Sequence, residues 1–277
     1  MLLFQPLKVG RLTLKNRIVM PAMQLELGLF TTQGIAFYRE RALGGVGTII
    51  TCATRVDCFV SDEAWGQPGD LDTFLRGLPR LVEAVHEAGA ILGVQLAHPA
   101  RYPAVVRGNR DGGEPVAPSP VEGRRGLARQ EIEAIIARFA AATARAREAG
   151  VDLVEFHGTH RSLLREFFSP LTNQRQDEFG QGLEGRMRLG LDIVRAARRE
   201  AGQDYPLCYR MAAEELAPGG IAIPDAIRYA QELEKAGVDL LDVSVAWEKM
   251  RRASPPRTAP LGTFAPQAAA IKAQVKV

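Results

Sequence analysis

The stretch VDLVEFHGTHRSLLREFFSPLTNQRQDEFG, at residues 151–180, carries the strongest structural signal in the chain. Its first six positions are apolar except for two acids, which predicts a buried strand. Two imidazoles, His157 and His160, stand where that strand should end, and the chain has only four histidines. Histidine is readily tuned near neutral pH and donates hydrogen bonds to carbonyl or anionic oxygens. This strand end is therefore typical of an active-site wall.

One junction occurs three times along the chain, as EAGA at residues 87–90, EAGV at 148–151 and KAGV at 235–238. In each copy a glycine ends a helix-like segment just before an apolar, strand-like one. Repetition of helix, glycine and strand implies parallel strands with helices packed outside, because each crossover returns the chain to the same edge. The repeat therefore predicts an α/β fold.

The hydrophobic periodicity predicts six strand-helix units in 277 residues. We expect strands at residues 17–23, 46–51, 91–96, 151–156, 206–211 and 238–245, and helices at 33–43, 71–88, 129–149, 183–201, 224–236 and 265–276. A closed (β/α)8 TIM barrel needs eight units. We expect one domain over residues 1–277, an incomplete barrel with about six of the eight units, truncated at its C-terminus. An open sheet and a wrong strand count are the alternatives.

Composition indicates an ordinary globular protein, with 46% apolar and 24% charged residues. The net charge of +3 gives no reason to expect nucleic acid or a membrane as a partner. One segment, residues 101–125, is rich in arginine, with Arg101, Arg107, Arg110, Arg124 and Arg125. A solvated loop is the favoured interpretation of that segment, and a site for an anionic ligand group is the alternative.

The three cysteines, Cys52, Cys58 and Cys208, are odd in number and form no CxxC motif. We therefore expect neither a metal site nor a disulfide framework, and a reducing compartment. The N-terminus is a poor signal peptide, and no apolar run has the length of a membrane span. These features predict a cytoplasmic protein.

Motifs spread along the chain resemble the Old Yellow Enzyme family of NADH:flavin oxidoreductases. They are NRIVM at 16–20, QLAH at 95–98, VEFHGTH at 154–160, Ser169-Pro170, Asn173, Arg175, Asp177, Phe179-Gly180 and RMR at 186–188. The motifs follow the family's order, and the run from residue 154 to 188 is the specific part. The resemblance implies an FMN-dependent (β/α)8 barrel.

The resemblance also implies a reaction and a role for the histidine pair. Family members use NADH or NADPH to reduce FMN, and then transfer a hydride to the activated C=C bond of an α,β-unsaturated carbonyl compound. His157 and His160 match the pair that hydrogen-bonds the carbonyl oxygen of the substrate. There they would stabilise the enolate charge as it develops.

Other positions match residues that hold the flavin ring in the family. Gln95 matches the residue at the polar pyrimidine edge, and Arg210 matches a cation near N1 that favours the anionic reduced flavin. The remaining matches are Pro21, Ala22 and Met23 in the loop after the first strand, and Ala53 after the second. A glutamine or alanine at a strand end is structural more often than not, so the prediction depends on their joint order.

The chain departs from the family after the histidines, where Arg161 and Ser162 replace glycine and the proton-donating tyrosine. Serine is too weak an acid to replace a phenol, so water or another residue would have to supply the proton. Arg161 either binds an acidic substrate or points to solvent. Trp247 either lines the substrate pocket or covers the barrel rim.

Charged residues of the signature after the histidines are expected to brace a loop rather than touch substrate. They are Arg175, Asp177 and Arg186.

In the family the FMN phosphate is bound after the seventh and eighth strands, which this sequence does not reach. We therefore expect weak FMN binding unless a partner, or a second copy in a homo-oligomer, supplies the missing wall. Two alternatives to the ene-reductase follow. The chain is a binding or scaffolding subunit without activity of its own, or a flavin-independent lyase that uses the histidines. Only the ene-reductase hypothesis requires bound flavin.

Overall fold

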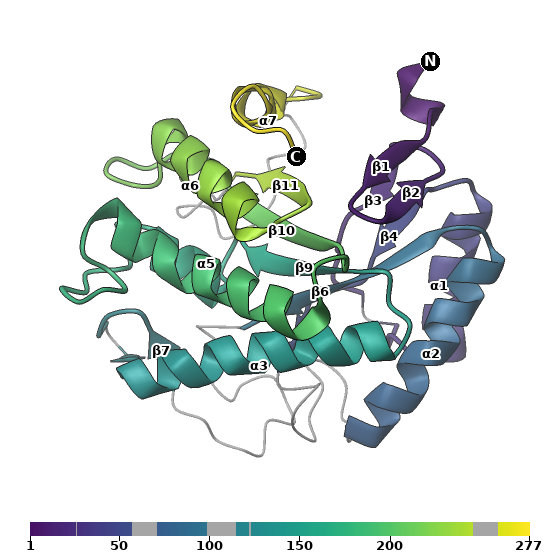
Figure 1. Ribbon diagram of the computed structural model, residues 1–277, viewed down its shortest axis with the longest axis horizontal. Coiled ribbons are helices and arrows are strands. Elements are labelled where there is room, and N and C mark those ends of the chain that lie inside the picture. The colour runs from purple at the N-terminus through teal and green to yellow at the C-terminus, as the bar shows by residue number, and fades with distance from the viewer. Residues whose placement is uncertain (26, 57–70, 99–114, 122, 246–259) are drawn as a thin grey trace.

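A curved parallel sheet with helices on its outer face forms the centre of the molecule (Figure 1). The computed structural model describes residues 1–25, 27–56, 71–98, 115–121, 123–245 and 260–277. The strands of the sheet lie in chain order: β3 (Val19–Met20), β4 (Thr48–Ile50), β6 (Ile91–Ala97), β9 (Leu153–Gly158), β10 (Leu207–Ala212) and β11 (Leu240–Ser244). Each pairing between these neighbours is parallel, as repeated strand-helix units require.

The first six helices lie between successive strands along the chain, and the seventh follows the last strand, β11. They are α1 (Thr32–Leu43), α2 (Leu71–Glu87), α3 (Arg129–Glu148), α4 (Leu163–Phe168), α5 (Gly182–Ala201), α6 (Ile223–Ala236) and α7 (Ala265–Lys272). Helices α3 and α5 lie side by side across the middle of the sheet, and α7 lies beside β11 (Figure 1). The order of the six predicted units is confirmed.

Strands β3 and β11 are the two edges of this sheet, and among the described residues no strand pair joins one to the other. The short strand β5 (Thr54–Arg55) also pairs with β6. Six neighbouring units of this kind form part of a (β/α)8 wall, so the predicted fold class is confirmed. None of the helices in the described ranges is both long and apolar enough to span a membrane.

The three repeated junctions have the predicted backbone conformation. Gly89, Gly150 and Gly237 have φ angles of 76°, 86° and 106°. This left-handed region is open to glycine and disfavoured for other residues, which explains why each helix stops there and the next strand begins.

Aromatic residues on the outer face join the sheet to the helices. The Phe156 ring packs edge-on against Phe139 of α3, with centroids 6.0 Å apart. In the next strand Tyr209 places its hydroxyl 2.8 Å from that of Tyr229 on α6. Gly190 of α5 lies against these two hydroxyls, so the pair occupies the space that a side chain at residue 190 would need.

Replacing Gly190 with alanine should lower the free energy of unfolding by about 1–3 kcal/mol, because the new methyl group overlaps the Tyr229 hydroxyl. Urea denaturation measures the change. Glu200→Ala, at an exposed position of the same helix, is the control and should be nearly neutral. Equal stability of the Gly190→Ala variant and the wild type would show that the tyrosine pair is not tightly packed.

Two element boundaries differ from the prediction by three residues or more. The strand expected at residues 17–23 is only Val19–Met20. The Asn16 side chain holds the backbone before it, accepting from Ile18 N (3.0 Å) and donating to Gly45 O (2.8 Å), and Pro21, which has no N–H to donate to a ladder, follows it. Helix α7 ends at Lys272 rather than at residue 276. The chain then turns toward α6, where the backbone amides of the last two residues donate to Glu234 Oε1.

Several short elements were not predicted. They are the 3-10 turn Leu2–Phe4, the hairpin of β1 (Leu7–Val9) and β2 (Leu12–Leu14), the pair β7 (Val116–Ala117) and β8 (Arg125–Gly126), and helix α4. All six residues of α4 are buried, so its sequence LLREFF has no amphipathic period to reveal it. Ser162 caps this helix by accepting from Arg165 N at 3.3 Å.

Candidate active site

Polar side chains of three adjacent strands lie level with one another near the carboxyl end of the sheet. Strand register places His157 of β9 opposite Arg210 of β10, and Arg210 opposite Asp242 of β11. Because Phe156 and Tyr209 pack on the outer helices, alternation along the strands directs these three residues to the inner face. Parallel strands bring such residues to the same end of the sheet, where active sites of α/β barrels lie.

The two histidines of the signature form a pair. Their ring centroids lie 5.2 Å apart with 39° between the planes, and His160 reaches this position with φ at 53°. Although both residues keep some solvent contact, burial lowers the pKa of His157 well below its usual range, with contributions from His160 and Arg210. Burial and the cations of Arg210 and Arg165 lower the pKa of His160 to about 4. Both imidazoles are therefore neutral at pH 7, each with one N–H donor.

One ring nitrogen of the two histidines has no hydrogen-bond partner among the described residues. The Nδ1 atom of His157 is buried and has no hydrogen-bond partner among the residues that the structure describes. A buried polar atom is normally paired, so this orphan indicates a position where a ligand atom completes the site.

Arg210 links the inner face to the loop after β3. Its Nε lies 3.0 Å from Asp242 Oδ2, in the geometry of an ion pair rather than a hydrogen bond. Its Nη1 donates to the carbonyl oxygen of Ala22 at 3.4 Å. These contacts bring the predicted flavin residues Ala22 and Arg210 together across the curved sheet, beside the histidine pair.

Gln95 lies one strand away and is held by a carboxyl group. Its Nε2 donates to Glu155 Oε1 at 2.6 Å, and Cys208 Sγ donates to Glu155 Oε2 at 3.3 Å. This contact uses the donor end of the amide, which leaves Gln95 Oε1 to accept from another group. Burial, together with the charge of Asp242, raises the pKa of Glu155 to about 7.

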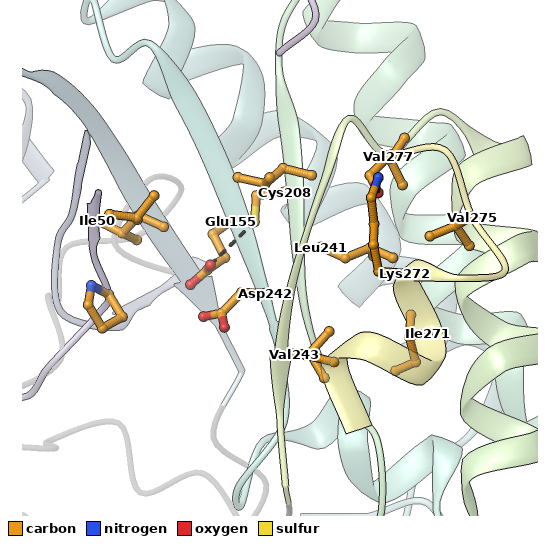
Figure 2. A pocket seen from close by; sticks show the side chains of 14 residues that line it. Ile50, Glu155, Cys208, Leu241, Asp242, Val243, Ile271, Lys272, Val275 and Val277 are labelled. Atoms are coloured by element: carbon orange, nitrogen blue, oxygen red, sulfur yellow. Dashed lines mark hydrogen bonds between the residues drawn. The ribbon is translucent and has the colours of Figure 1, made fainter. Parts of the chain in front are cut away.

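A cavity of about 440 Å³ is lined by inner-face residues, by both sides of β11, and by α7 and the segment after it (Figure 2). Figure 2 shows the carboxyl groups of Glu155 and Asp242 pointing into the same space, opposite Ile50. Pro21 also lines this cavity, whereas the two histidines do not. The cavity is therefore distinct from the histidine site.

The raised pKa of Glu155 predicts a pH dependence of stability. The folded state holds this proton more tightly than the unfolded state, so the stabilisation is complete below about pH 4.5 and is lost as pH rises through about 7. The free energy of unfolding should fall by on the order of 1.4 kcal/mol for each pH unit between the pKa of Glu155 in the unfolded state and its pKa in the folded state. Urea denaturation between pH 4.5 and 8 should show this decline in the wild type and a flatter profile in Glu155→Gln.

Glu131→Gln is the control for that profile. Arg125 and the backbone of Ala128 lower the pKa of Glu131 to about 2, so its contribution is lost only in acid. The variant should keep the wild-type decline between pH 4.5 and 7. An unchanged decline in Glu155→Gln would assign the effect to other groups.

The remaining predicted site residues are less constrained. Met23 is 46% exposed, and Ala53 is half-buried between β4 and β5. Arg161 is exposed, and Trp247 lies outside the described residues. Among the described residues, no hydrogen bond, ion pair or ring contact joins the side chains of Met23, Ala53 or Arg161 to the histidine pair. The roles of these residues and of Trp247 stay predictions.

The charged residues of the signature brace a loop, as predicted. Arg175 Nη1 donates to the carbonyl oxygens of Pro118 (2.8 Å) and Leu127 (2.6 Å), and its Nη2 pairs with Asp177 at 2.6 Å. Arg186 donates to the carbonyl oxygen of Phe168 at 3.1 Å.

One part of the arginine-rich segment was predicted wrongly as solvated. Arg124 pairs with the buried Glu166 of α4 at 2.8 Å and is only 12% exposed. Arg125 pairs with Glu131 at 2.6 Å. Sequence reasoning missed the contact of Arg124 because Glu166 lies 42 residues later in the chain, in a helix whose six residues are all buried. Arg101, Arg107 and Arg110 lie outside the described residues.

Sequence reasoning also missed a buried ion pair behind His160. Arg165 and Glu215 are both fully buried, and Arg165 Nη1 lies 2.6 Å from Glu215 Oε1. The available signal was a pair of charges, Arg165 and Glu166, inside the apolar run of residues 163–168. Charged residues are almost never fully buried unless they are paired, but the sequence does not identify the partner.

Comparison with known proteins places these features in context. The model of the NADH:flavin oxidoreductase / NADH oxidase family matches residues 2–274. A metal reductase of Desulforamulus reducens is 36% identical over 100% of this chain and 42% of its own length. An NADPH dehydrogenase of Geobacillus sp. is 37% identical over 88% of this chain and 72% of its own length. The chain thus spans about two fifths of the first of these relatives.

A solved structure gives the same result for the fold. Morphinone reductase in complex with tetrahydroNAD matches with a TM-score of 0.79 and 28% identity, over 99% of this chain and 78% of its own.

Proposed function

The chain belongs to the NADH:flavin oxidoreductase / NADH oxidase family, and from this premise we propose that it is an FMN-dependent ene-reductase. It uses NADH or NADPH to reduce the activated C=C bond of a small α,β-unsaturated carbonyl compound, and residues 1–277 form its barrel domain. The observation that carries this proposal is the neutral pair His157 and His160 beside Arg210 on the inner face. Two imidazole donors next to a fixed cation suit an oxyanion better than any other ligand group.

The residues on the inner face fit FMN. Gln95 has an acceptor oxygen to offer and Arg210 carries a positive charge, while the buried Nδ1 of His157, which lacks a partner among the described atoms, is left for the substrate. Gln95 and Arg210 would hold the polar edge of the ring, with Pro21, Ala22, Met23 and Ala53 along it. When bound, FMN supplies the hydride transfer from NAD(P)H to the substrate.

His157 and His160 bind the substrate carbonyl oxygen and orient the C=C bond. Their low pKa values keep both imidazoles neutral at pH 7, so each has one N–H to donate and neither changes its charge as the enolate forms. Preorganised donors aimed at the oxygen stabilise the enolate more than the ground-state carbonyl group, which lowers the barrier.

The proton for the α-carbon comes from water. Ser162, which stands where the family has its tyrosine, is 4% exposed and accepts a hydrogen bond as the cap of α4. Its hydroxyl is also a much weaker acid than a phenol. Arg161, which is exposed beside His160, would attract a substrate that carries an acidic group.

Anaerobic oxidation of NADPH and of NADH, measured with 2-cyclohexenone and with the saturated cyclohexanone, tests the proposal. Oxidation that requires FMN and the enone, with formation of cyclohexanone, is the expected result. Oxidation that proceeds equally with the saturated ketone would contradict reduction of a C=C bond.

The scaffolding alternative gives a different result in the same assay, because it predicts no turnover with either substrate. In that case the edges of β3 and β11 are the places where strands of a partner or of a second copy would pair, since edge strands present unpaired backbone groups. Turnover without flavin or nicotinamide would instead support the lyase hypothesis.

A further inference from the structure

The buried ion pair of Arg165 and Glu215 lies directly behind the histidine pair. Arg165 Nε donates to the carbonyl oxygen of His160 at 2.7 Å, while its Nη1 lies 2.6 Å from Glu215 Oε1. Both side chains are fully buried. Burying two charges is unfavourable unless their geometry is excellent, so the position of this pair calls for an explanation.

The pair joins two unusual points of the backbone. Among the described residues, His160 (φ 53°) and Leu216 (φ 51°) are the non-glycine residues with a left-handed backbone. His160 accepts a hydrogen bond from Arg165 through its carbonyl group, and Leu216 directly follows Glu215. Non-glycine residues persist in this conformation only where their surroundings hold them.

Glu215 is itself fixed by the loop after β10. Its Oε2 accepts from Ser169 Oγ at 2.7 Å and from Ile221 N at 2.9 Å, and its backbone amide donates to the carbonyl oxygen of Ile221 at 3.0 Å. The carboxylate therefore has three donors for its two oxygens. A rigid anchor of this kind fixes Arg165, and Arg165 in turn fixes the turn that carries His160.

We propose that Arg165, held by Glu215, is a positioning residue that keeps the His160 imidazole beside that of His157. The planar guanidinium reaches two acceptors in different directions through Nε and Nη1, and a lysine ammonium on its flexible stem cannot reproduce that fork. Arg165 also helps to lower the pKa of His160. Burial is the main cause of that lowered pKa, followed by the charges of Arg210 and Arg165, so Arg165 contributes to keeping this imidazole neutral while its geometry places the ring.

Arg165→Lys tests the geometry because it keeps the charge. The control is Arg198→Lys, which alters another buried arginine that donates to a backbone carbonyl, Tyr205 O at 2.5 Å, and pairs with Asp239 at 2.8 Å. These contacts lie before β10 and β11, at the opposite end of the sheet from the histidines.

The direct measurement is the nuclear Overhauser effect between the ring protons of His157 and His160, recorded on the 277-residue chain without flavin. Four histidines keep the imidazole region simple to assign. The effect should be lost or strongly weakened in Arg165→Lys and retained in Arg198→Lys. A wild-type effect in folded Arg165→Lys would overturn the proposal.

The kinetic measurement rests on the proposed function. With FMN and enone, kcat should fall by roughly ten- to a hundredfold in Arg165→Lys, because a displacement of about 1 Å in a catalytic group has effects of this size, while the amount of bound FMN stays the same. Wild-type kcat in this variant would contradict the proposal. If the wild type has no enone activity, the proposed function fails, and the ring-proton measurement still decides the role of Arg165.

Ser169→Ala is the second variant, for use if Arg165→Lys does not fold. It removes one neutral donor from Glu215 Oε2 and leaves the ion pair in place. The ring-proton effect should weaken by a smaller amount in this variant. An unchanged ring-proton effect in Ser169→Ala would overturn the proposal that the contacts of Glu215 help to hold His160 in place.

Discussion

Replacement of His157 or His160 by alanine should reduce kcat/KM for enone reduction by on the order of a hundredfold or more, since each imidazole supplies one of the donors to the developing oxyanion. The two rings lie 5.2 Å apart and influence each other electrostatically. Residues that act as a unit have non-additive effects. The double variant should therefore lose less than the product of the two single losses.

The measurement is single-turnover oxidation of the pre-reduced, FMN-loaded protein by enone, under anaerobic conditions. His86→Ala is the matched control, because this histidine contacts Asp152 Oδ2 at 2.6 Å, at the start of β9 and away from the carboxyl end of the sheet. The control should react at the wild-type rate. Enone reduction within a few-fold of wild type in the double variant would refute the role assigned to the pair.

Glu215→Ala should lower the free energy of unfolding by about 3–5 kcal/mol, the usual loss when one partner of a buried ion pair is removed. The loss arises because Arg165 would keep its charge in a fully buried position without a compensating carboxylate. The variant would also leave Ser169 Oγ and Ile221 N without their acceptor, and each unsatisfied buried donor adds to the penalty.

Urea denaturation compares this variant with Glu133→Ala. Glu133 also accepts from an arginine, Arg129 Nε at 2.9 Å, but both side chains of that pair are more than half exposed. Exposed pairs spaced four residues apart on a helix contribute only about 0.3–0.5 kcal/mol. Similar losses in the two variants would mean that the Arg165–Glu215 pair is not the anchor that its burial indicates.

The sequence alone predicted much of this fold, because the repeated glycine junctions and the apolar strands are local signals. The glycine after each helix requires a left-handed backbone that no distant contact has to supply. The first strand was predicted too long because the Asn16 side chain, which bonds to Gly45, holds the backbone before it and Pro21 ends the ladder after it. Helix α4 was missed because burial on all sides removes the amphipathic period.

The sequence predicted the parts of the site that lie within recognisable motifs. The spacing of His157 and His160 indicated a pair, and the structure brings the two rings together. The support behind them was not predictable, because Arg165 finds its partner 50 residues later in the chain. Similarly, the contact of Glu155 with Gln95 spans 60 residues. The second contact follows from the register of β6 and β9 and the first from the packing of α4 against the loop after β10, and neither is a local signal in the sequence.

The most direct test of the account is the visible absorption spectrum of the 277-residue chain, mixed with FMN, desalted and then treated with NADPH or NADH without oxygen. A retained flavin band that is bleached by the nicotinamide and restored by 2-cyclohexenone is the result that a flavin-dependent ene-reductase predicts. A folded chain that leaves the desalting column without flavin, and that also oxidises no nicotinamide when FMN and 2-cyclohexenone are added back, would contradict the claim that these residues carry out flavin chemistry in this chain.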